Sequence, residues 1–89
     1  MRYFMHISDA NGFVEDEEGC ELPDHEAARR EAISAARDLM ASDLRDGHLD
    51  LTSFIEVQDE AHNLLFTIIF ADVVKVMTVA DPARRQPSR

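Results

Sequence analysis

His6 and the acidic run that follows it are the side chains in this sequence best suited to chemistry. An imidazole can transfer protons or bind metals, and carboxylates such as Asp16, Glu17 and Glu18 suit hard cations. A working site would need a second histidine, a cysteine or a carboxylate converging on His6, and no spacing identifies one. We therefore expect His6 to be structural, bonded to a neighbouring strand or to the acidic loop. The alternative is a metal or ligand site of His6, Asp16, Glu17 and Glu18.

Other catalytic patterns have little support. Cys20 stands near Glu18 and Glu21, and acidic neighbours raise the pKa of a thiol and suppress the thiolate. No serine lies in a G-x-S-x-G pattern, and no glycine-rich phosphate loop is present. The stretch Asp9-x-Asn11-Gly12 matches only the start of a calcium-binding loop. We expect no catalytic residue, no cofactor and a non-enzymatic protein.

Length and composition predict one small domain. The chain has 89 residues and is 45% hydrophobic, which is enough for one modest core. We assign residues 1–80 to a single domain and residues 81–89 to a disordered tail. A core of this size has a small stability margin, so we expect self-association, with a homodimer as the simplest form.

Cysteine content and hydropathy predict the compartment. Cys20 is the single cysteine, which suits a reducing environment. No stretch approaches the ~20 apolar residues that cross a bilayer. We expect a cytoplasmic protein without a membrane partner.

Charge restricts the partners. Residues 1–81 hold all 18 acidic residues and six of the nine basic residues, which gives a net charge of −12. Such a surface repels a phosphate backbone and disfavours nucleic-acid binding. It keeps a small protein in solution, and it also suits a basic protein partner.

The central element is a helix that begins after Asp24. This residue is a suitable N-cap, and Glu26 and Arg30 are spaced as a favourable i, i+4 pair. Gly47 is placed to end the helix. Apolar residues recur at helical spacing and predict the buried stripe: Ala28, Ala32, Ile33, Ala35, Ala36, Leu39, Met40 and Leu44. The small alanines should let the helix approach its neighbour closely.

Two hairpins flank this helix. The first joins residues 2–7 to Phe13 and Val14, with Phe4 and His6 on one face and Tyr3, Met5 and Ile7 on the other. The segment 15–22 between hairpin and helix is predicted to be an acidic loop. The second hairpin joins residues 54–58 to 64–70. Its last strand is apolar on both faces, so it is either central in the sheet or covered by something other than water.

The predicted fold is α+β with the order β-β-α-β-β. One helix packs on a four-stranded, largely antiparallel sheet. Residues 73–79 could form a short helix or another strand, and the pattern does not choose between them.

Several short motifs of this sequence resemble those of a known protein family. Arg2-Tyr-Phe-x-His6, then Glu18-Gly-x-Glu-Leu-x-Asp24, the alanine-rich helix and Ile55-Glu-Val-x-Asp59 resemble an uncharacterised family of small bacterial proteins, a domain of unknown function, over residues 2–72. The resemblance implies a shared fold and no particular activity.

Three functions fit these expectations. The favoured hypothesis is a small acidic module for protein interaction or oligomerisation. The first alternative is an antitoxin or regulator that masks a basic partner, by fold analogy with the HicB antitoxins. The second alternative is a metal or small-ligand sensor that uses His6 and the acidic loop.

Overall fold

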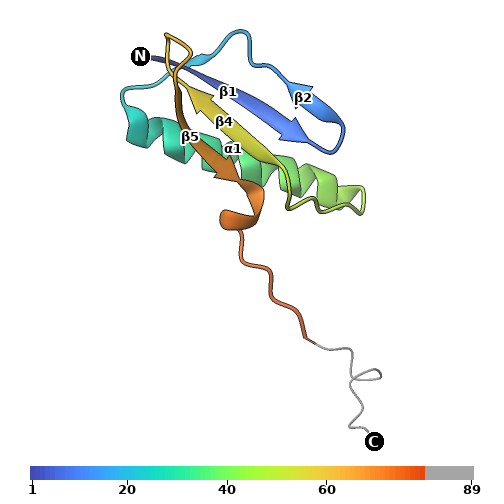
Figure 1. Ribbon diagram of the computed structural model, residues 1–89. Helices are drawn as coiled ribbons and strands as arrows, with labels where there is room; N and C mark the ends of the chain where they lie inside the picture. Colours follow the sequence, from blue (N-terminus) through green and yellow to red (C-terminus); the bar gives the residue numbers. More distant parts are fainter. Residues whose placement is uncertain (80–89) are drawn as a thin grey trace, which may run out of the picture.

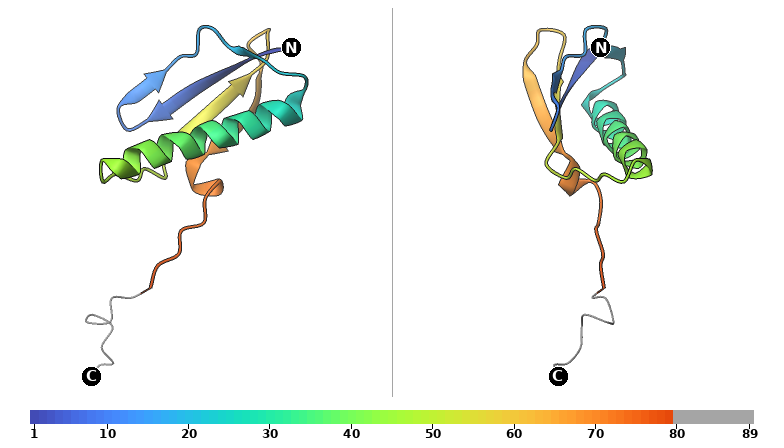
Figure 2. Two further views of the ribbon diagram at one scale, coloured as in Figure 1. Left: turned by 180° about the vertical axis from the view of Figure 1, so that it is seen from behind. Right: turned by 90° about the vertical axis from the view of Figure 1, so that its right-hand side faces the viewer.

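Five antiparallel strands and one long helix form two layers (Figure 1). The structure is a computed structural model and describes residues 1–79, so the predicted tail 81–89 lies outside the described residues. The elements, in chain order, are β1 Arg2–Asp9, β2 Gly12–Val14, β3 Cys20–Glu21, α1 His25–Arg45, β4 Phe54–Gln58, β5 Leu64–Ile69 and the 3-10 turn η1 Phe70–Asp72. The predicted α+β class, with one helix on one face of the sheet, is confirmed (Figure 2).

The helix begins and ends where the sequence predicts. Asp24 caps it, because its Oδ1 accepts the Ala27 N–H over 2.8 Å. Gly47 follows the last turn with φ +84°, a left-handed conformation that glycine adopts without strain. Ala28, Ala32 and Ala36 are fully buried, so the helix backbone lies close to the sheet. The buried stripe ends at Met40, and Leu44, predicted to belong to it, is exposed.

The strand order is β2-β1-β4-β5. The centre of the sheet is the antiparallel pair of β1 and β4, in which His6 lies opposite Glu56. Of the two alternatives for the last strand, the central position is wrong, because β5 pairs only with β4 in the described sheet and forms its edge. Local apolar content could not distinguish a central strand from an edge strand whose second face is left open.

The predicted division of β1 into two faces is confirmed. Tyr3 is completely buried under α1 together with Ile55 and Val57 of β4. Phe4 and His6 point to the opposite side, which we call the outer face. Within residues 1–79, no element covers this outer face as α1 covers the inner one (Figure 2).

Two segments differ from prediction. The predicted acidic loop contains β3, in which Cys20 and Glu21 pair with Tyr3 and Arg2. So short a strand has no periodicity that a sequence could display. Phe70, predicted to end the last strand, instead begins η1, and Val74 to Val79 form neither of the two predicted elements. No helix of the described chain is long and apolar enough to cross a membrane.

Candidate functional site on the outer face of the sheet

His6 occupies the middle of the outer face and is almost completely buried, with 4% of its surface exposed. The backbone N–H of Asp16 donates to Nδ1 of His6 over 3.0 Å. On the other side of the ring, Nε2 lies 3.1 Å from Oε1 of Gln58 on β4. Because a backbone N–H can only donate, Nδ1 must be the acceptor and Nε2 must carry the proton. The two bonds therefore fix one neutral tautomer of the imidazole.

Aromatic rings enclose the imidazole. Phe4 lies parallel to it, with an interplanar angle of 5° and 6.4 Å between ring centres. Phe13 of β2 lies 5.7 Å away at a tilted angle. His62, in the loop between β4 and β5, lies 5.1 Å from Phe4 and extends the group. Both ring nitrogens of His6 thus bond to groups of the domain, and two aromatic rings lie beside the imidazole.

Asp16 bridges a gap in the ladder of β1. Along this edge, β2 pairs with residues 7–9 and β3 with residues 2–3, so Met5 faces neither strand. The Asp16 carboxylate fills the gap: Oδ2 accepts the Met5 N–H and Oδ1 accepts the Gly19 N–H, each over 3.0 Å. Partial burial raises the pKa of Asp16, but these amide donors outweigh it and lower the pKa below its ordinary value.

Gly19 lets the loop approach β1 closely. Its φ is +71°, and an added Cβ would lie 2.8 Å from the carbonyl oxygen of Tyr3. Beside it, the Arg2 guanidinium donates to the Glu18 carbonyl oxygen over 2.6 Å and lies 3.7 Å from the Glu21 carboxylate. The loop between β2 and β3 is therefore fastened to β1 at several points, and it closes over one side of His6.

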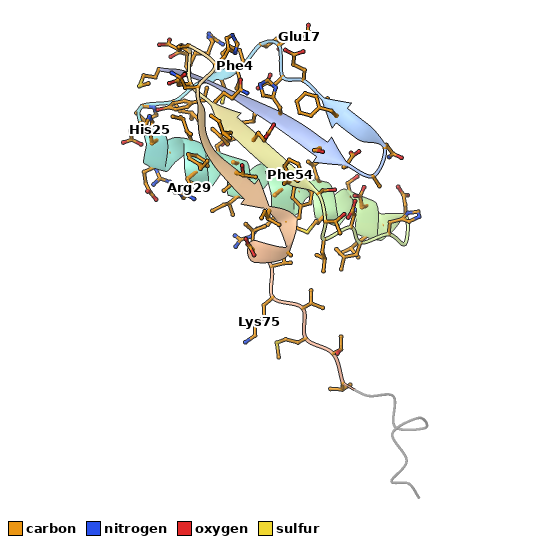
Figure 3. The ribbon with its side chains drawn as sticks, viewed as in Figure 1. Phe4, Glu17, His25, Arg29, Phe54 and Lys75 are labelled. Atoms are coloured by element: carbon orange, nitrogen blue, oxygen red, sulfur yellow. The ribbon has the colours of Figure 1, made fainter. Side chains whose placement is uncertain are left out.

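The structure brings together only part of the proposed metal set. Asp16 reaches His6 through its backbone amide, and its carboxylate faces Met5 and Gly19 instead of the imidazole. Glu17 and Glu18 are exposed, with Glu17 on the outside of the loop (Figure 3). Among residues 1–79, no three histidine, cysteine or acidic side chains are grouped so that they could hold a metal ion.

Cys20 is the first residue of β3, within the predicted acidic loop, and pairs with Tyr3 of β1. Burial raises its pKa, and the carboxylates of Glu31 and Asp16 raise it further. The raised pKa of Cys20 agrees with the prediction. Its main cause is burial, however, and Glu31 lies on α1 rather than in the adjacent loop. The thiolate is therefore disfavoured.

Charge is divided between the two sides of the domain. Apart from Arg2, every basic residue of the described chain lies on α1 or after η1: Arg29, Arg30, Arg37, Arg45 and Lys75. Arg2 is engaged by the loop. Carboxylates of Glu15, Glu17, Glu56 and Glu60 belong to the strands and loops of the sheet layer. The sheet layer is consequently acidic, whereas the four arginines of α1 are balanced by four acidic residues of the same helix, Glu26, Glu31, Asp38 and Asp43.

Apolar side chains lie among these carboxylates. Pairing across β2, β1, β4 and β5 places Phe13, Ser8, Phe54 and Ile69 in one row. The terminal members, Phe13 and Ile69, are 57% and 43% exposed. Leu64, opposite Gln58 at the other end of β5, is 55% exposed. Large apolar side chains at both ends of an open sheet face are a feature of binding surfaces.

Gln58 and Phe13 were not predicted as neighbours of His6. The available signal was alternation: Gln58 belongs to the polar side of residues 54–58, and His6 belongs to the less apolar side of residues 2–7. To predict that these two sides meet, one must know the order of the strands, and alternation within a strand does not reveal that order.

Comparisons with known proteins identify one family. A family model described as a domain of unknown function (DUF6894) matches residues 2–71. No curated protein and no solved structure matches the chain. The matched range begins at Arg2 and ends in η1, so it contains every residue that surrounds His6. The predicted membership of an uncharacterised family is confirmed.

Proposed function

The chain belongs to the DUF6894 family of domains of unknown function, and we propose that it is a small non-enzymatic module that binds a basic protein through its outer sheet face. The observation that carries this proposal is the combination on that face of exposed apolar side chains, Phe13, Leu64 and Ile69, with carboxylates. Apolar contact supplies binding free energy, and opposite charge supplies orientation and a fast encounter.

The non-enzymatic part of the proposal is supported by His6. A general acid or base must present a ring nitrogen to a substrate, whereas both nitrogens of His6 bond to groups of the domain. Asp16 likewise uses its two carboxylate oxygens on backbone amides. In the described chain, no buried side-chain nitrogen or oxygen lacks a hydrogen-bond partner.

A basic partner is favoured over a second outer face. Two copies placed outer face to outer face would bring Glu15, Glu17 and Glu56 of one copy near those of the other. Such like-charge contact is unfavourable, and each carboxylate would also lose hydration. A lysine- or arginine-rich surface avoids this repulsion, and its positive charges compensate the carboxylates for lost hydration. A cytoplasmic location also belongs to this proposal, and the lone Cys20 supports it.

The test is capture from a native-host lysate followed by binding of the purified partner. We would compare the wild-type chain with Glu17→Lys/Glu56→Lys, which reverses charge on the sheet layer. The matched control is Glu26→Lys/Glu31→Lys, which reverses the same charge on α1. We expect a partner of basic isoelectric point, weaker binding at higher salt, and about a tenfold or greater loss of affinity for the sheet-layer variant alone.

Two results would overturn the proposal. One is a purified partner that is acidic or neutral. The other is a partner that binds both charge-reversed variants equally well while circular dichroism shows both to be folded.

A further inference from the structure

Among residues 1–79, no strand pairs with the second edge of β5, and this edge can accept another strand. It lies at the end of the order β2-β1-β4-β5. The Phe70 N–H donates to the Ser53 carbonyl oxygen over 2.9 Å, so the alternation of antiparallel pairing turns the backbone groups of Thr67 and Ile69 away from β4. Proteins commonly protect such edges with charged residues or proline, and Leu64–Ile69, Leu-Leu-Phe-Thr-Ile-Ile, contains neither.

Residues 73–79 have the sequence of a strand but no strand partner in the structure. The segment reads Val-Val-Lys-Val-Met-Thr-Val, a β-branched composition typical of sheets. Val76, Met77 and Val79 are 54%, 77% and 84% exposed. Figure 1 shows this segment leaving the domain beyond η1. An apolar segment exposed in this way gains stability by pairing.

The path of the chain directs the segment away from its own β5. Phe70 is buried with 3% exposure, which holds η1 in the core. The Arg37 Nε donates to the Val73 carbonyl oxygen over 2.9 Å and fixes the exit point on α1. To lie along its own β5, the chain would have to reverse within η1 and lose these contacts.

The segment matches the edge in length and is opposite to the domain in charge. Seven extended residues span about 23 Å and the six residues of β5 about 20 Å. Residues 1–72 hold 17 acidic and five basic residues, whereas the segment 73–79 holds Lys75 and no acidic residue. The segment of one copy is therefore attracted to the domain of another.

We propose that residues 73–79 of one copy add as a further strand to the β5 edge of a second copy, and that the second copy returns the same contact. Reciprocal exchange closes a dimer with two equivalent interfaces. This contact uses the edge of β5 and not the outer face, so it is independent of the basic partner proposed above.

The first test is the mass in solution, measured by light scattering on the full chain. We expect twice the 10.1 kDa of one chain. Val76→Pro/Met77→Pro should yield monomer, because two successive prolines remove an edge-facing N–H in either register. Val76→Thr/Met77→Val keeps strand propensity and should remain dimeric. A monomeric wild type, or a dimer that survives the prolines, would overturn the proposal.

The β5 edge, to which the segment is proposed to add, is tested separately. Thr67→Pro removes an N–H that faces away from β4, so we expect a folded monomer, with Thr67→Val as the dimeric control. A cross-linking experiment covers the case in which this proline prevents folding. In a Cys20→Ser background, a Thr67→Cys copy is mixed with copies that carry single cysteines at positions 74 to 78. Disulfides between position 67 and the segment are expected, and equal yields of 67–67 pairs would contradict the proposed contact.

Discussion

The backbone amide of Asp16 donates to Nδ1 of His6 over 3.0 Å, and this bond joins the acidic loop to the strand that carries the histidine. His6→Ala would remove the acceptor of that amide and the partner of the Gln58 side chain in an almost fully buried place. The Asp16 amide left without its acceptor, the lost bond to Gln58 and the cavity should together lower the free energy of unfolding by about 2 to 4 kcal/mol, as measured in urea.

His6→Asn is the matched variant for this prediction. Its side-chain oxygen can occupy the place of Nδ1 and accept the Asp16 N–H, but it cannot reach Gln58. We expect an intermediate loss of stability, and nitrogen NMR of the wild type should show the proton of the neutral ring on Nε2. A His6→Ala variant as stable as the wild type would mean that His6 is not a structural residue.

Gly19→Ala should destabilise the domain more than Gly47→Ala. Both glycines have positive φ, +71° and +84°, so both substitutions carry the conformational cost of a left-handed alanine, about 1 kcal/mol. Only at Gly19 would the added Cβ also meet the Tyr3 carbonyl oxygen, at 2.8 Å, whereas nothing lies within 4 Å at Gly47. Urea denaturation of the two variants measures the difference, and equal losses would show that the loop yields to the added methyl group.

Asp50 should make stability depend on pH in the acidic range. Hydrogen bonds from the side chain and backbone of Thr52, and from the Ser53 hydroxyl, lower its pKa from 3.8 to about 2. Because the folded-state pKa is the lower one, the stabilisation is fully present above the unfolded value near 3.8. It is lost as the pH falls through about 2.

The measurement is the free energy of unfolding of wild type and Asp50→Asn at several pH values. The difference between them should be largest near neutral pH and shrink as the pH falls from about 4 to 2. Asp38→Asn removes a carboxylate on α1 that accepts none of these bonds, and it serves as the control. A difference that stays constant over this range would exclude Asp50 as a source of acid sensitivity.

The features predicted from sequence are those set by nearby residues. Asp24, the alanine stripe and Gly47 specify α1 within one segment, and alternation assigns Tyr3 and His6 to opposite faces of β1. His6 bonds to both a neighbouring strand and the acidic loop, the two expected kinds of partner, but the individual residues were not predictable, because Asp16 and Gln58 are 10 and 52 residues distant in sequence. Their convergence depends on strand order, which places β4 beside β1.

The acidic loop shows the same limit. A run of carboxylates without periodicity reads as solvated loop, and Glu17 fits that interpretation. Asp16 differs because β2 and β3 leave the Met5 amide without a strand partner, and a carboxylate supplies the acceptor. This role of Asp16 depends on the gap between the residues of β1 that pair with β2 and those that pair with β3. The gap can be recognised only when the positions of both short strands on β1 are known.

The close approach of α1 to the sheet should depend on the small size of Ala32. This residue is fully buried, between Ala28 and Ala36 on the same stripe. Ala32→Leu adds three carbon atoms where the helix lies against β4, so it should lower the free energy of unfolding by about 1 to 3 kcal/mol. Ala41→Leu makes the same change at an exposed position of α1 and should be nearly neutral in the same denaturation experiment. Equal effects of the two substitutions would mean that the helix can move outward without cost, and that the alanines do not set its distance from the sheet.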